Sequence, residues 1–108
     1  MTETRLSLQI AADHPSFAGH FPGRPIVPGV VLLDEVLQAV EQHLPELGLF
    51  AGSGAVEIAV CKFLAPVLPG ATLALTLTWE GHGTPLSFKL HQGTQLVASG
   101  SLRGTPQP

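Results

Sequence analysis

The sequence predicts an α+β fold in which one long apolar helix packs against an antiparallel β-sheet. Three observations support this prediction. A helical pattern of apolar residues covers residues 30–44, alternating patterns typical of strands lie on both sides of it, and segments rich in proline and glycine separate these elements. Because most of the predicted strands follow one another through short turns, we expect antiparallel pairing.

The N-terminal part begins with a predicted strand, in which Leu6, Leu8 and Ile10 alternate with polar residues. Residues 13–29 then contain so many prolines and glycines that no regular element longer than a turn fits there. This segment is therefore expected to be a stiff loop that leads into the helix.

The predicted helix carries a broad apolar stripe whose members recur at steps of three and four. The stripe consists of Val30, Leu33, Leu37, Val40 and Leu44. Further apolar residues beside it widen the stripe, so we expect the helix to be buried on most sides. Pro45 and Gly48 are expected to end it.

Four more strands are predicted after the helix, at residues 55–63, 73–79, 86–90 and 96–102. In the first of them, Val56, Ile58 and Val60 are expected on one face, and Cys61 is expected to be a small buried residue. Turns are predicted at residues 66–70, 81–85 and 93–94. Residues 1–108 form a single predicted domain, with residues 103–108 as a frayed tail.

The composition predicts an oligomer. Charged residues make up 12% of the chain, hydrophobic residues make up 44%, and the net charge is −3. An average soluble domain has roughly 25% charged residues. A monomer of 108 residues would have difficulty hiding so much apolar surface, and association with a second chain removes it from water.

The composition also excludes several classes. Five scattered basic residues do not form a patch that follows phosphates, so nucleic-acid binding is not expected. A single cysteine excludes a disulfide framework and a cysteine-based zinc site. No secretory signal or membrane helix is recognised, and the expectation is a soluble cytoplasmic protein.

The loop before the helix holds the candidate catalytic groups. Its prolines make it stiff, and a stiff loop can hold the His20 imidazole in place as a general base. Gly29 lies at the helix start, where its N–H has no partner within the helix and can donate to a thioester carbonyl. The alternative is an ordinary loop that carries a histidine by chance. Asp34, at the edge of the stripe, is either a tolerated polar residue or a proton donor.

Residues 20–30, with the sequence HFPGRPIVPGV, are followed by Asp34 and Gln38, and this block resembles the 3-hydroxyacyl-[acyl-carrier-protein] dehydratases of the FabA/FabZ type. In that family a carboxylate follows the histidine by fourteen residues, and here 34 − 20 = 14. A second block, Lys62-Phe63 with Pro66-Val67 and Pro69-Gly70, is similar to the segment after the family's central helix. The resemblance covers residues 13–102 and implies a hot-dog fold, in which the sheet wraps around the helix.

The resemblance implies a role for each matching residue. His20 would remove the α-proton of a 3-hydroxyacyl thioester, and Asp34, from the partner subunit, would protonate the leaving hydroxyl. The N–H of Gly29 would bind the thioester carbonyl. Further substrate contacts are implied for Phe21, Pro28 and Val30. The substrate would be a thioester of acyl carrier protein or CoA, the assembly a homodimer or a heterodimer with another hot-dog subunit, and no metal or organic cofactor would be required.

The chain departs from the family at several positions. Asp34 stands where the branch with this loop usually has glutamate, Leu64-Ala65 replaces a basic pair that can help to dock the carrier protein, and the chain has no tyrosine. The short chain is similar to the small dehydratases of aryl-polyene and polyketide-type pathways. A hot-dog thioesterase and a non-catalytic acyl-binding subunit remain alternatives.

Overall fold

The computed structural model describes residues 2–10, 27–43, 56–80 and 85–104. One helix and five strands form in these ranges. They are β1 (Thr2–Gln9), α1 (Gly29–His43), β2 (Val56–Phe63), β3 (Thr72–Trp79), β4 (Leu86–Gln92) and β5 (Gln95–Gly104). The predicted α+β class is confirmed.

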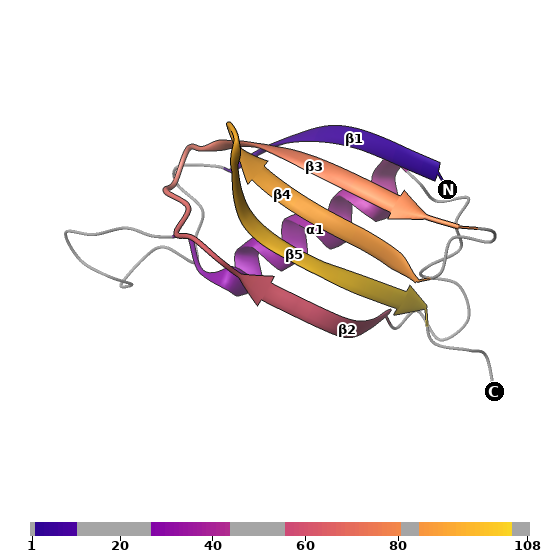
Figure 1. Ribbon diagram of the computed structural model, residues 1–108. Helices are drawn as coiled ribbons and strands as arrows, with labels where there is room; N and C mark the ends of the chain where they lie inside the picture. The colour runs from indigo at the N-terminus through magenta and orange to yellow at the C-terminus, as the bar shows by residue number, and fades with distance from the viewer. Residues whose placement is uncertain (1, 11–26, 44–55, 81–84, 105–108) are drawn as a thin grey trace.

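The five strands form one antiparallel sheet in the order β1-β3-β4-β5-β2. Helix α1 runs along one face of this sheet (Figure 1). Strands β3, β4 and β5 form a meander, and β1 and β2 are the two edge strands. The sheet therefore has an inner face toward the helix and an outer face.

Alternation along the strands supplies the core. In β3 and β4, every second residue is buried on the inner face, and the intervening residues are polar or small. The central pairs Leu75–Leu90 and Leu77–Phe88 lie directly opposite each other in register. The core residues of the sheet and helix form one continuous cluster, so a single core connects both layers.

Glycines at two turns adopt the left-handed conformation that L-residues disfavour. Gly70, before β3, has a φ of 85°, and Gly93, between β4 and β5, has a φ of 61°. Both lie in segments where the sequence predicts turns. Strand β5 continues to Gly104 by pairing with β2, two residues beyond the predicted strand end at Leu102.

Strand β2 contains an irregularity that changes the direction of its side chains. The pairing with β5 shifts between Ile58 and Val60, so Ile58 pairs with the inner-face residue Leu102, whereas Val60 pairs with Ser101 on the outer face. The prediction that Val56, Ile58 and Val60 share one face is therefore wrong for Val60. A bulge adds a residue to one strand and reverses the alternation beyond it.

Helix α1 is buried on one side only. Its buried residues are Val31, Leu32, Val36, Ala39 and Val40. Val30, which the sequence placed in the apolar stripe, is 71% exposed, and Asp34 and Gln38 are exposed on the same side one and two turns later. The expectation of a helix buried on most sides is wrong for the isolated chain, and the predicted end at Pro45 lies outside the described residues. No helix in the described ranges has the length and hydropathy needed to cross a membrane.

Candidate active site

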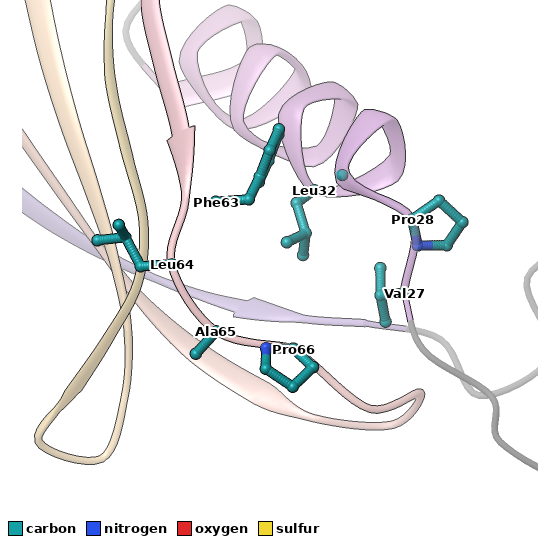
Figure 2. Close-up of a pocket in the computed structure, with 8 residues that line it drawn as sticks. Val27, Pro28, Leu32, Phe63, Leu64, Ala65 and Pro66 are labelled. Carbon is teal, nitrogen blue, oxygen red and sulfur yellow. The ribbon is translucent and has the colours of Figure 1, made fainter.

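A cavity of about 420 Å³ lies between the start of α1 and the end of β2 (Figure 2). Its walls are mostly apolar, and they come from segments far apart in the sequence. The lining residues are Val27, Pro28, Gly29, Leu32, Phe63, Leu64, Ala65 and Pro66. The volume is in the range of small-molecule sites, which are commonly apolar with a few polar groups that fix orientation.

The helix start is held in place by backbone hydrogen bonds. The N–H of Val27 donates to the carbonyl of Val67 at 2.7 Å and ties the approach to α1 to the segment after β2. The Pro28 carbonyl accepts hydrogen bonds from the N–H groups of Val31 and Leu32 at 2.9 and 3.3 Å. Pro28 itself has a fixed φ and needs no hydrogen-bond acceptor, which suits the residue that precedes a helix.

Gly29 is the first residue of α1 and lines the cavity. Among the described residues, no backbone carbonyl accepts a hydrogen bond from its N–H. An N–H in the first turn lies at the positive end of the helix dipole and is oriented to bind a partly negative oxygen. The cavity therefore has apolar walls, and one of its lining residues is the first residue of the helix, whose N–H has no acceptor within the helix.

Asp34 lies away from this cavity in its own chain. Its side chain is exposed and accepts a hydrogen bond from Nε2 of Gln38 at Oδ2, with a distance of 2.6 Å. It does not line the cavity, and neither does Val30. Of the residues singled out in the sequence, the structure brings together Pro28 and Gly29, whereas Asp34 and Val30 share the exposed side of the helix. His20 and Phe21 lie outside the described residues.

Phe63, like Val27 and Leu32, lines the cavity although sequence reasoning assigns it no role. It belongs to the block that resembles the family after the helix, but no role was inferred for it. Its inner-face position follows from its pairing with Ala98 in β5, and this pairing can be known only once the register is known. The bulge in β2 is what makes alternation along the sequence insufficient to place it.

Cys61 is partly buried on the same strand, in agreement with its expected role as a small apolar residue. Burial raises the pKa of its thiol. A raised pKa lowers the fraction of thiolate, which is the nucleophilic form. This direction gives no support for Cys61 as a nucleophile.

Comparison with known proteins gives the family. A protein-family model described as "ApeI-like: ApeI dehydratase" matches residues 1–101. The 3-hydroxyacyl-[acyl-carrier-protein] dehydratase FabZ of Alkaliphilus metalliredigens is 36% identical over 104 residues, covering 86% of this chain and 67% of the relative. The FabZ of Acetivibrio thermocellus is 34% identical, covering 83% of this chain and 59% of the relative. The chain thus spans about two thirds of the length of these curated relatives.

Solved structures agree with the fold. A chain from the dehydratase heterocomplex ApeI:P of Xenorhabdus doucetiae has a TM-score of 0.75 and 29% identity, covering 94% of this chain and 85% of that chain. A 1,4-dihydroxy-2-naphthoyl-CoA thioesterase from Synechocystis has a TM-score of 0.65 at 18% identity, covering 99% of this chain and 90% of that chain. The second likeness concerns the fold alone. Together with the five-stranded antiparallel sheet and its single helix, these neighbours confirm the hot-dog fold, and the match over residues 1–101 shows that the chain belongs to the ApeI-like dehydratase family.

Proposed function

We propose that this chain eliminates water from a 3-hydroxyacyl thioester to give a trans-2-enoyl thioester. The proposal rests on the apolar cavity at the start of α1, which is lined in part by Gly29, a residue whose N–H has no backbone acceptor among the described residues. An apolar acyl group fits such walls, and a thioester carbonyl needs a donor where negative charge develops during removal of the α-proton. Family membership supports the same chemistry.

In this proposal, three residues act in the reaction as the base, the acid and the carbonyl-binding group. His20 takes the α-proton, since a neutral imidazole can accept a proton at physiological pH. Asp34 donates a proton to the leaving 3-hydroxyl, which departs as water, and the electron pair of the broken C–H bond becomes the new C=C bond. The Gly29 N–H binds the thioester oxygen while charge accumulates on it.

We propose that Asp34 acts on the site of a second hot-dog subunit. In its own chain the carboxylate points to solvent and does not line the cavity. Val30, one turn earlier on the same side, leaves 71% of its surface in water, so this side of α1 offers apolar area that a partner can cover. A partner over this side of α1 would bury both residues and bring the carboxylate to an apolar environment.

We also propose that the acyl group of the substrate is carried by acyl carrier protein or by CoA. The FabZ relatives are enzymes whose names specify acyl carrier protein. However, Leu64 and Ala65, which line the present cavity, stand where the family often has basic residues, and Leu64 is exposed. We therefore expect carrier contacts here to be less dependent on salt than contacts made through a basic pair.

The test is to incubate the protein with 3-hydroxyacyl thioesters of acyl carrier protein and of CoA. Mass spectrometry detects turnover as the loss of one water. We expect His20→Ala and Asp34→Asn each to lower kcat by roughly 10²-fold or more, because general acid–base groups contribute about 10²–10⁴-fold. The combined variant should lose far less than the product of the two losses, since both groups act in one step. Wild-type rates in both variants would contradict the assignment of His20 and Asp34.

The same assay separates the alternatives. A hot-dog thioesterase would release free thiol from the acyl thioester without loss of water. A non-catalytic acyl-binding subunit would bind the 3-hydroxyacyl thioester and leave it unchanged. No specific feature of the cavity favours either alternative over dehydration.

A further inference from the structure

Backbone conformation does not explain why residue 29 is glycine. The described glycines with a left-handed backbone are Gly70 and Gly93, so Gly29 does not need glycine for its φ. Glycine is also a poor helix former, less favourable than alanine by about 1 kcal/mol inside a helix. A close neighbour of residue 29 offers a reason.

That neighbour is the ring of Phe63. A Cβ atom at position 29 would lie 2.8 Å from both Cε2 and Cζ of Phe63 and 3.1 Å from Cδ2. These distances are well below normal carbon–carbon contacts of about 3.5–4.0 Å. The ring at the end of β2 therefore occupies the space that a side chain at position 29 would fill, beside the first turn of α1 (Figure 2).

The contact holds the candidate carbonyl-binding group from one side. The hydrogen bond from Val27 N–H to Val67 holds the chain just before Pro28, and Phe63 packs directly on Gly29. The Pro28–Gly29 peptide, whose N–H belongs to a residue that lines the cavity, thus lies between these two restraints. Phe63 is half exposed, at 50%, so core packing accounts for only part of its surface.

We propose that Phe63 is a positioning residue for dehydration, whose ring sets the place of the Gly29 N–H and forms one wall of the acyl-binding cavity. This inference rests on the proposed function. Displacing a catalytic group by about 1 Å can cost roughly 10²-fold in rate. Removal of the ring should therefore act on the chemical step more than on substrate binding.

The decisive experiment is a double-mutant cycle between positions 29 and 63 with a 3-hydroxyacyl thioester as substrate. We expect Phe63→Ala to lower kcat about 10-fold with KM within about 3-fold of wild type, and Gly29→Ala to lower kcat about 100-fold. In the double variant the alanine methyl group enters the space that the ring has left. Its kcat should therefore be about 10-fold below wild type, whereas independent effects would multiply to about 1,000-fold.

Leu68→Ala is the matched control. Leu68 is an exposed apolar residue like Phe63, at 61%, but it does not line the cavity. We expect wild-type kcat and KM for this variant. Light scattering and thermal unfolding should show that all variants keep the wild-type mass and fold, and the inference is wrong if the losses at positions 29 and 63 simply multiply or if Phe63→Ala keeps the wild-type kcat.

A spectroscopic measurement tests the contact without catalysis. An aromatic ring packed on Gly29 should displace the NMR signals of its α-protons in the wild type, and Phe63→Ala should return them toward ordinary glycine values. Absence of this displacement overturns the inference alone. Absence of wild-type dehydration with the displacement present would show instead that the proposed function is wrong and that the contact is structural.

Discussion

Pro28 and Gly29 are neighbours with opposite backbone properties, and together they build the end of the helix that faces the cavity. Proline restricts φ and supplies a carbonyl that accepts from both Val31 and Leu32. Glycine gives an N–H without a side chain, and Phe63 fills the vacant space. The site therefore depends on the absence of a side chain at residue 29 as much as on the backbone N–H of that residue.

At the scale of single residues, Cys61 gives a prediction about pH. Because burial raises the pKa of its thiol, alkylation by iodoacetamide at pH 7–8 should be slower in the folded protein than in the protein unfolded by urea. The folded state holds the proton more tightly than the unfolded state. The contribution of this thiol to the free energy of unfolding is therefore fully present below its unfolded pKa of about 8.5 and declines as the pH rises above that value.

The measurement is the rate of mass gain in native protein and in protein unfolded by urea. A native rate equal to the unfolded rate would contradict the raised pKa. Cys61→Ala should give no mass gain and controls for other reactive groups.

Sequence reasoning reached some site residues and missed others for physical reasons. Pro28 and Gly29 could be found because a helix start has a local signature. The exposure of Asp34 could not be predicted from the sequence. A broad apolar stripe does not show which part of the helix surface its own chain buries and which part stays exposed. Phe63 could not be found either, because its contact with Gly29 joins elements 34 residues apart in the chain (63 − 29 = 34).

At the scale of elements, strands β3 and β4 followed the prediction closely because strict alternation determines both their type and their faces. The prediction of a strand at β2 is confirmed, but the prediction of which of its side chains share a face is wrong for Val60. The bulge between Ile58 and Val60 moves Val60 to the outer face, and nothing in the sequence of β2 marks where a bulge begins.

The pairing of β2 with β5 depends on a glycine in β5, which leads to a prediction about stability. A Cβ atom at Gly100 would lie 2.3 Å from the Val60 carbonyl oxygen and 2.7 Å from the Phe88 ring. Gly100→Ala should therefore force the sheet apart beside the bulge and lower the free energy of unfolding by about 3 kcal/mol. Urea denaturation at one fixed protein concentration measures this loss.

Gly93→Ala is the control for this comparison. Gly93 has no atom within 4 Å of its Cβ position, and only its φ of 61° opposes a side chain. The expected loss is about 1 kcal/mol, from backbone strain alone. Equal losses in the two variants would show that steric contact at Gly100 is not the dominant effect.

At the scale of the whole molecule, the two edges of the sheet differ in character. The outward side chains of β1 are polar or charged, including Arg5 and Ser7, whereas β2 exposes Ile58 and Val60. An edge strand offers unpaired backbone groups, and charged residues discourage association there. The low charge of the composition predicted an oligomer, and the structure locates its surplus apolar surface along β2 and the adjacent start of α1.

The contrast between the two edges predicts which of them a second subunit covers. If a second hot-dog subunit pairs along β2, an aspartate at an exposed β2 position would be buried in the interface without a partner, and such burial costs several kcal/mol. Ile58→Asp and Val60→Asp, on opposite faces of β2, should each reduce the particle mass measured by light scattering to that of one chain, 11.3 kDa. Ser7→Asp, on the opposite edge strand β1, should keep the wild-type mass.

The particle mass of the wild-type protein also distinguishes association of identical chains from association with a different hot-dog subunit. A wild-type mass of two chains or more, lost in both β2 variants and kept in Ser7→Asp, indicates association of identical chains through β2. A single-chain mass for the wild type would indicate that this edge needs a different hot-dog subunit, and the two β2 variants should then fail to bind that subunit. Retention of an oligomer in both β2 variants would contradict the β2 interface, and with it the proposal that Asp34 completes the site of a partner at that edge.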